Sequence, residues 1–445
     1  MSVFSIALFL ILNDRFHLAG EWVIGGFEAK GIAYAFVLLG LNQVFRNRWN
    51  RAWPVLGIAA AFHVVVGGWA ILATGIAYLL TQLIPIHPDD RRLLTTKNHE
   101  SPSRQFIPLL IGFCIALIGI LPPLLSEWST AERIARQAHF VHVHERIHHH
   151  LMFESFGTMQ IARFSFLIMT WAVFTGCFWN RVLFRRLNLF CAATLLVSFA
   201  GLILSGIAEP ADGTGAAEFE LANTATSLLR FYWFRIADFA LPFGIAMATS
   251  VAITRSIKAT ENAASHKFAA RLFCVLILAA FAFAVAHRYG DLRPLADKNS
   301  LPTYIDDPVR TKQTFQNWVK VCEWARDNTP EDAVFITPVE QQTFKWYAQR
   351  NEVASWKDTP QDADSVIIWR DRLQRVYYPQ KEYDGGLLAL SDEQLLMLSK
   401  DFNVDYLLIP QSDLDQIQSR TRLKQVYPMN RMSKSTYVIF KFPDR

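Results

Sequence analysis

The densest group of residues that could do chemistry is a run of histidines and arginines. Six of the chain's twelve histidines lie between His139 and His150, beside Arg146. Imidazoles titrate near neutral pH, and a guanidinium group matches the oxygens of a phosphate. The run lies between two apolar segments, which would place it at the surface of a membrane. We therefore expect Arg146, with the imidazoles around it, to bind a phosphate group.

Two other interpretations of this histidine run stay open. His144 and His148 have the i, i+4 spacing of helical zinc ligands, which makes a divalent metal a candidate cofactor, although no HExxH motif is formed. Alternatively, the run is a solvated or interfacial helix whose histidines bind nothing specific. We assign no metal ligand and leave the cofactor unknown.

A second group of residues precedes the apolar run that starts at Gly31. Glu28 and Lys30 follow the pair Gly25-Gly26, which permits a tight backbone. A carboxylate at a membrane surface acts as a general base when its pKa is tuned. The alternative is that Glu28 and Lys30 are ordinary charges at a membrane boundary.

A third group surrounds an aromatic cluster at the start of another apolar run. Arg230 and Arg235 flank Phe-Tyr-Trp-Phe, and Asp238 lies about one turn into the apolar region. Ionisable groups at such a depth are costly and are usually paired or functional. We expect Asp238 to pair with Arg235 or Arg230 and the three to contact substrate. An aromatic belt with a structural ion pair is the alternative.

The elements that position these residues are long apolar runs, which recur through residues 1–287. A run of about 18 or more apolar residues is a candidate membrane span. Four runs reach or approach this length and two are shorter: Phe106–Leu125, Leu189–Ile207, Ile236–Thr254 and Leu272–Ala286, then Gly31–Phe45 and Phe164–Phe178.

Two further apolar segments are harder to assign. Val55–Ile84 is long for one span and short for two, so we expect a hairpin of two short helices. Val3–Leu12 is short for a span and lacks the basic start and cleavage site of a signal peptide, which would fit a start inside a longer natural chain. The domain 1–287 then has about seven to nine membrane helices.

Residues 288–445 have the composition of a soluble domain. Apolar residues at helical or alternating spacing recur between Pro-containing breaks, so helices and strands alternate, which indicates an α/β layer structure. The expected helices are Arg310–Asp327, Gln341–Gln349, Asp362–Tyr377 and Leu395–Lys400, and the expected strands are Ala333–Thr337, Val404–Ile409, Leu423–Tyr427 and Thr436–Phe442. The predicted fold is a multispanning α-helical membrane protein with a C-terminal α/β soluble domain.

Within this domain, Phe344–Arg350 and Trp356–Pro360 interleave aromatic and charged residues. Such segments suit the stacking of a sugar or docking onto the membrane domain. They suit equally a domain core with lysines that extend to solvent, which is the interpretation we favour.

Lysine and arginine are unequally distributed over the loops. The segments 46–53, 86–105, 179–188 and 255–271 hold 14 of them, whereas 14–30, 126–163 and 208–235 hold 8 over a greater length. Basic loops stay in the cytoplasm. We therefore expect the histidine run and the C-terminal domain to be extracytoplasmic, in a multi-pass protein of the inner membrane.

Several functional classes are excluded or disfavoured. No GxGxxG or GxxxxGK[ST] motif is present, and we expect no nucleic-acid partner. The five cysteines form no CxxC pair, and four of them fall inside apolar runs. No paired inverted repeats are recognisable, so a transporter ranks last. The lipid bilayer is the expected partner.

Five segments together resemble an uncharacterised family of bacterial, notably planctomycete-type, polytopic membrane proteins. The likeness covers most of the chain, and the layout is similar to that of the GT-C superfamily of glycosyltransferases. The segments are Gly25–Lys30, Ala61–Trp69, Arg146–Leu151, Arg230–Asp238 and Phe344–Pro360.

The GT-C likeness implies transfer of a sugar from a polyprenyl-phosphate carrier on the outer face of the membrane. It implies that Glu28 or Glu21, in the first outer loop, is the base, and that Arg146, His149 and His150 hold the lipid phosphate. The chain departs from the pattern because a full first span and a long outer loop are missing before Glu21. The alternative is a non-catalytic membrane protein that binds or moves a lipid or a polysaccharide.

Overall fold

The computed structural model divides the chain into two compact units, Met1–Ala284 and Val285–Arg445. Most of the basic segment 86–105, on which the predicted orientation partly depends, lies outside the described residues. The described residues are 2–24, 28–84, 102–128, 130–179, 181–209, 216–258, 264–292, 308–339, 341–378, 390–414, 423–429 and 435–443.

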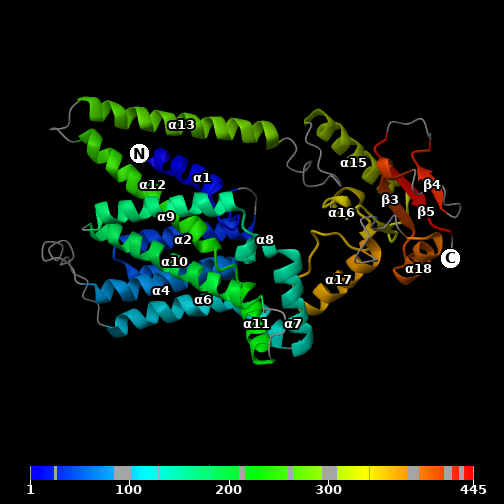
Figure 1. Ribbon diagram of the computed structural model, residues 1–445, viewed down its shortest axis with the longest axis horizontal. Coiled ribbons are helices and arrows are strands. Elements are labelled where there is room, and N and C mark those ends of the chain that lie inside the picture. Colours follow the sequence, from blue (N-terminus) through cyan, green and yellow to red (C-terminus); the bar gives the residue numbers. More distant parts are fainter. Residues whose placement is uncertain are drawn as a thin grey trace. The chain divides into compact units, whose positions relative to one another are not determined.

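Apolar helices dominate the first unit, which we call the membrane unit (Figure 1). Among the described residues, six helical stretches are long and apolar enough to cross a membrane: Val64–Leu83, Phe106–Leu125, Thr158–Phe178, Phe184–Ile207, Arg235–Ile257 and Ala264–Ala286. The predicted class of multispanning membrane protein is thereby confirmed.

The helices of this unit run in chain order from α1 to α13. The long ones are α1 (Ser2–Phe16), α2 (Ala29–Phe45), α3 (Trp49–Phe62), α4 (Val64–Leu83), α6 (Pro102–Trp128), α9 (Thr158–Phe178), α10 (Val182–Ile207), α11 (Ala216–Leu229), α12 (Arg235–Lys258) and α13 (Ala264–Leu292). Shorter ones connect α6 to α9: α7 (Glu132–Phe140), the π-helix η1 (Val141–Arg146), α8 (His148–Leu151) and the 3₁₀ turn η2 (Phe153–Ser155).

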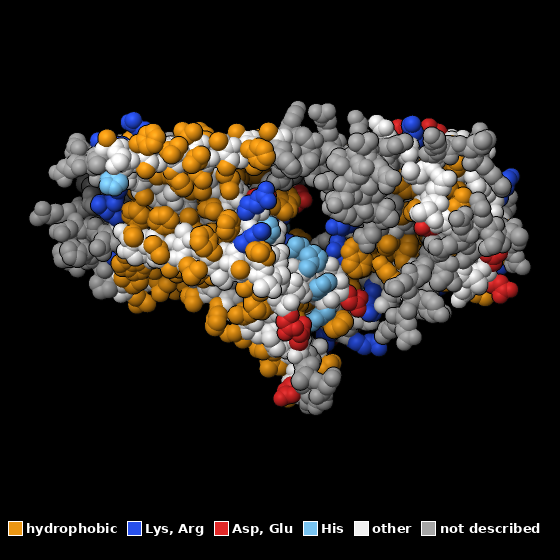
Figure 2. Space-filling model, turned by 45° about the horizontal axis from the view of Figure 1, so that its top comes forward, with side chains coloured by type: hydrophobic (Ala, Val, Ile, Leu, Met, Phe, Trp, Pro, Cys, Tyr) orange, Lys and Arg blue, Asp and Glu red, His pale blue; other side chains and the backbone are white. Residues whose placement is uncertain are grey.

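The face of the membrane unit that Figure 2 shows is apolar along its helices. Large apolar side chains that water would disfavour are exposed on α6 and α13, among them Ile118 and Phe283, each at least 70% exposed. Lipid tails are as apolar as these side chains, so such exposure costs nothing in a bilayer. Histidines gather instead at one end of the unit, where α7, η1 and α8 lie.

Helices α3 and α4 fold back on each other within the segment 55–84. His63 separates them in an extended conformation, and its Nδ1 accepts a hydrogen bond of 3.3 Å from the amide of Val66. One turn later, a Cβ atom on Gly67 would lie 2.1 Å from the backbone nitrogen of Ala60. Only glycine permits this close approach of two helix backbones, as in other membrane helix pairs. The first helix is short, whereas α4 has 20 residues.

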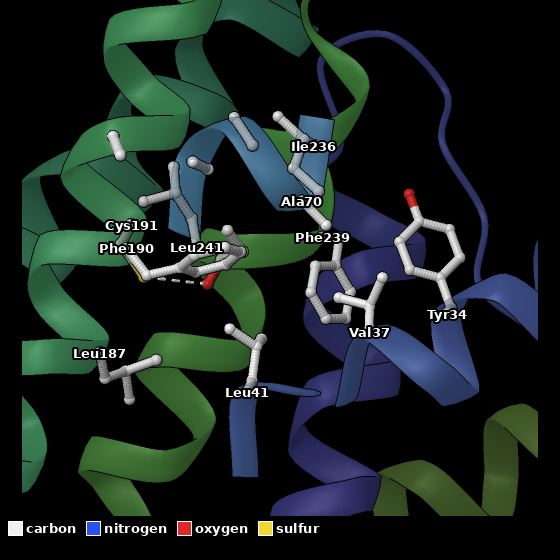
Figure 3. Close-up of a cluster of buried hydrophobic side chains, with 14 of the residues drawn as sticks. Tyr34, Val37, Leu41, Ala70, Leu187, Phe190, Cys191, Ile236, Phe239 and Leu241 are labelled. Carbon is white, nitrogen blue, oxygen red and sulfur yellow. Dashed lines mark hydrogen bonds between the residues drawn. The ribbon is translucent and has the colours of Figure 1, made fainter. Parts of the chain in front are cut away.

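The core of the membrane unit joins α2, α10 and α12 (Figure 3). Tyr34, Val37 and Leu41 lie one turn apart on α2 and point toward Phe239 and Leu241 of α12. Buried apolar contacts of this kind hold α12 against α2 and α10. They therefore fix the positions of the polar residues at the ends of α2 and α12.

The second unit contains a five-stranded mixed sheet with the strand order β2-β1-β3-β5-β4. The strands β2, β1 and β3 are parallel, whereas β5 runs antiparallel to β3 and β4. The strands are β1 (Val334–Ile336), β2 (Asn351–Glu352), β3 (Tyr406–Pro410), β4 (Lys424–Tyr427) and β5 (Tyr437–Lys441), and the helices are α15 (Pro308–Asn328), α16 (Phe344–Ala348), α17 (Ala363–Tyr377) and α18 (Asp392–Asp401).

The predicted α/β character of this C-terminal region is confirmed, and all four expected strands are present. Trp318 of α15 is fully buried against Phe344 and Tyr437, which explains the helical spacing of apolar residues in that helix. The sequence did not predict β2, because two residues, Asn351 and Glu352, carry no alternating pattern. They become a strand by pairing with β1.

The contact at Gly67 gives a first prediction. The variant Gly67→Ala should lose about 1–3 kcal/mol of stability, because the added methyl group would overlap the backbone of α3. The adjacent Gly68 is the matched control, since a Cβ there has nothing within 4 Å. Thermal unfolding of both variants in detergent should show a lower Tm for Gly67→Ala alone. Equal Tm values would contradict the packing of α3 on α4.

Candidate functional site

The loop between α1 and α2 is tied to α12 by the buried carboxylate of Asp238. The backbone amides of Leu18 and Ala19 donate to it at 2.7 and 2.9 Å, and that of Glu21 donates at 3.3 Å. Asn13 adds a side-chain bond of 3.1 Å to the Asp238 carbonyl. The expected pairing of Asp238 with Arg235 or Arg230 is wrong, because backbone amides satisfy this carboxylate instead.

The fold therefore turns the side chain of Glu21 into the protein, where it is completely buried. Tyr34 donates a hydrogen bond of 3.0 Å to its Oε1. Its Oε2 lies 3.1 Å from Nε of Arg235 and 3.7 Å from Nζ of Lys30. Burial raises the pKa of Glu21, and the nearby Arg235 and Lys30 oppose this shift without cancelling it.

One oxygen of Glu21 is left without a hydrogen bond. Within the described part of the chain, Oε2 has ion-pair partners but no donor in hydrogen-bonding geometry. The two cations are held in place by aromatic rings: Lys30 lies 3.7 Å from the ring centre of Trp22, and the guanidinium of Arg235 lies 3.5 Å from that of Tyr232. The carboxylate thus keeps one acceptor site between two fixed positive charges.

His150 contacts the same loop from α8. Its Nδ1 lies 2.7 Å from the carbonyl oxygen of Ala19, and because a carbonyl only accepts, Nδ1 carries the proton. Burial lowers the pKa of His150 to about 4, so the neutral ring keeps Nε2 as an acceptor. Gly20 has a φ of 74°, and a Cβ there would meet the His150 ring at 3.1 Å. A side chain at position 20 would therefore press against the His150 ring and would also strain the backbone at this φ.

Arg230 belongs to a separate cluster between α6, α7 and α11. It pairs with Glu127, whose other oxygen lies 3.3 Å from Nε2 of His139. The Nδ1 of His139 lies 2.9 Å from the hydroxyl of Ser227. Burial, together with the nearby Arg230, lowers the pKa of His139 to about 4, and Glu127 opposes this shift without cancelling it. Arg230 and His139 thus hold α6, α7 and α11 together and make none of the contacts with Glu21 described above.

The remaining predicted site residues are less enclosed. Glu28 is exposed at the start of α2, with no side-chain hydrogen bond to cap the helix. Arg146 is partly buried at the end of η1, and His149 is exposed with its ring 4.1 Å from that of His150. The structure therefore brings Glu21, Arg235, Asp238 and His150 together around one loop.

The metal interpretation gains no support from the described residues, which contain no group of three or more His, Cys, Asp or Glu able to hold an ion. Nε2 of His144 lies 3.1 Å from the hydroxyl of Thr226 on α11. His144 therefore contributes to the packing of η1 onto α11.

Three residues of the site were not predicted from the sequence as members of it: Asn13, Tyr34 and Trp22. Tyr34 follows Lys30 by four residues on α2, which places both on one helix face. A tyrosine in an apolar helix, one turn after a lysine, could have indicated that Tyr34 belongs to the site. Asn13 gave a weaker one, because a polar residue near the end of a short apolar helix is common.

One segment of the second unit matches a known protein family. Residues 316–376 match a domain of unknown function (DUF6798). No curated protein matches the chain. The matched segment includes α16, β1, β2 and most of α17, and it ends before β3. The chain is therefore an integral membrane protein that carries this domain, and the match does not extend to the Glu21 loop.

Asp238 gives the second prediction. In Asp238→Asn, one acceptor becomes an NH₂ group that faces backbone N–H groups, so the loop 17–21 should loosen at a cost of about 1–3 kcal/mol. Hydrogen–deuterium exchange should then be faster at Leu18, Ala19 and Glu21. Asp14→Asn, an exposed carboxylate beside Arg15, is the control and should leave these amides unchanged. Unchanged exchange in Asp238→Asn would refute the tie between the loop and α12.

His150 gives the third prediction, on pH. Its folded pKa lies below the ordinary value of 6.5, so protonation favours the open loop, and protection is lost as pH falls from about 6.5 toward 4. The protection factors of the amides at 18–21, which correct for the slower intrinsic exchange at lower pH, should fall over this range. The variant His150→Gln, whose amide can still donate to Ala19, should show a smaller fall. An identical pH response in both proteins would exclude His150 as the group responsible.

Proposed function

We propose that the membrane unit binds a polyprenyl-phosphate-linked sugar and transfers the sugar to an acceptor, with Glu21 as the general base. The observation that carries this proposal is the buried Glu21 carboxylate, which keeps one oxygen without a hydrogen-bond donor between Arg235 and Lys30. The layout of the chain, similar to that of GT-C glycosyltransferases, supports the reaction class.

The environment of Glu21 suits proton abstraction from an acceptor hydroxyl. A general base works best when its pKa lies near the working pH, and burial moves the pKa of Glu21 upward in that direction. A hydroxyl that donates to Oε2 would complete the hydrogen bonding of this oxygen. Because the carboxylate is enclosed, the loop 17–24 must open for an acceptor to reach it, and Gly20 supplies a flexible position in that loop.

The lipid phosphate would lie against the histidine segment. Arg146 offers a guanidinium fork and His149 an imidazole, whereas His150, whose Nδ1 donates to Ala19, would contact a phosphate oxygen only after Nε2 gains a proton. Arg235 and Asp238 position Glu21 in this proposal, whereas Arg230 keeps α6 and α11 together through Glu127. The substrate-binding role expected for Arg230 therefore becomes a positioning role.

The proposed location is the bacterial inner membrane, with the Glu21 site and the C-terminal unit on the extracytoplasmic side. The contacts among three polar segments support their lying on one side: Glu21 with Arg235 joins 17–24 to 216–235, Ala19 with His150 joins 17–24 to 127–151, and His139 with Ser227 joins 127–151 to 216–235. The surplus of lysine and arginine in the opposite loops supports the direction.

A non-catalytic protein that binds or moves a lipid or a polysaccharide is the second candidate. It is favoured by one observation, the complete enclosure of Glu21 by Tyr34, Arg235 and Lys30, which is also what a structural ion-pair network looks like. Both candidates predict that the chain binds a lipid or a glycan, and only the first predicts that a sugar is transferred.

Glu21→Gln gives the fourth prediction and separates the candidates. The purified chain in detergent is supplied with a radiolabelled polyprenyl-phospho-sugar and a lipid or glycan acceptor, and product formation and donor binding are both measured. Loss of the base should lower the rate at least about 100-fold with donor binding retained. Thermal unfolding checks that the variant is folded.

Glu28→Gln is the matched control, since Glu28 is exposed in the same loop region and should retain the wild-type rate. Turnover at the wild-type rate in Glu21→Gln would remove Glu21 as the base. Donor binding without turnover in the wild type would favour the non-catalytic candidate. Absence of donor binding would reject transfer of a sugar from this carrier.

A further inference from the structure

The second unit contains a polar cluster at the carboxyl ends of its parallel strands. Thr337 follows β1 directly, and Glu352 ends β2. In open α/β sheets, ligands bind beyond the carboxyl ends of the parallel strands. The position of these two residues in the sheet therefore marks the edge at which a site would form.

The inner part of the cluster is buried and fully hydrogen-bonded. The hydroxyl of Thr337 donates to Oε2 of Glu352 at 2.8 Å, and Gln341 donates to the same oxygen. Oε1 of Gln341 accepts from the amides of Thr343 and Phe344, which fixes the start of α16. The Glu352 side chain is only 3% exposed. This network holds α16 rigidly at the edge of the sheet.

The outer part of the cluster reaches the surface. Lys345 of α16 lies 3.7 Å from Oε1 of Glu352 and also pairs with Asp358. Lys345 and Asp358 are each about half exposed. The next residue on α16, Trp346, is 79% exposed, although the neighbouring Phe344 is completely buried. The face of this indole is therefore available to a ligand.

We propose that this edge binds a neutral oligosaccharide, with Trp346 as the stacking surface and the half-exposed Lys345 and Asp358 as the polar contacts, while the buried Glu352 holds Lys345 in place. An exposed indole offers an apolar face to the C–H side of a sugar ring, and fixed charged groups beside it match sugar hydroxyls. Lys345 lies between two carboxylates, so the cluster has no surplus of positive charge, which favours a neutral ligand over an anionic one.

All the residues of this cluster lie inside the segment that matches the domain of unknown function. Sugar binding would then be a property of that domain. It does not depend on the chemistry proposed for the membrane unit, so either proposal can fail without the other.

The test uses the full chain, purified in a detergent without a sugar headgroup. Calorimetric titration with cello-, chito- and malto-oligosaccharides should show saturable binding to at least one of them. The surface variants Trp346→Ala and Asp358→Ala should each weaken that binding about tenfold or more. Met397→Ala, an apolar side chain 65% exposed on α18, is the matched control and should bind as the wild type does.

Four outcomes would overturn the proposal. These are no binding to any of the neutral oligosaccharides, equal binding by the wild type and Trp346→Ala, or tighter binding of an anionic oligogalacturonate than of the neutral series. The fourth is loss of vesicle binding in Trp346→Ala without any glycan binding, which would make the indole a membrane-surface anchor.

Discussion

The buried carboxylate of Asp238 is the constraint on which the site depends. It stands in the first turn of a membrane helix and receives the amides of Leu18, Ala19 and Glu21. An ionisable group in this position is tolerated because each oxygen accepts at least one backbone hydrogen bond. The same bonds leave the loop 17–21 little freedom, so Glu21 must turn toward Tyr34 and Arg235.

A second constraint comes from the bilayer. Lipid removes the hydrophobic reason for helices to associate, so close packing and polar contacts must hold them together. The chain meets this requirement with Gly67 against α3 and with polar pairs at the helix ends, such as Glu127 with Arg230 and His139 with Ser227. His139 and His144 therefore serve helix packing, and His150 reaches the Glu21 loop.

The sequence was sufficient to predict the membrane class and the strands of the second unit, because long apolar runs and alternating patterns are local signals. It was also sufficient to single out Glu21, Arg235, Asp238 and His150 as candidates. It could not show how they pair. Asp238 was expected to pair with an arginine, and its real partners are backbone amides some 220 positions away in the chain.

Contacts of this range depend on helix packing and leave no trace in local spacing. For the same reason Tyr34 and Asn13 were not predicted as members of the site. The strand β2 was not predicted because two residues are too few to form an alternating pattern. Trp346 and Phe344 show the reverse case: two aromatic residues in one short segment, of which the structure buries one and exposes the other. Sequence alone could not separate core from surface there.

The most direct test of the account is whether its three polar segments share one side of the membrane. Single cysteines at Ile24, Arg133 and Glu218, all exposed, would be labelled in sealed cells with a membrane-impermeant maleimide, in a background without the five native cysteines. The account predicts that all three react on the same side and that a cysteine at Arg181, at the other end of α9 and α10, reacts on the opposite side. Labelling of any one of the three from the side of Arg181 would contradict it.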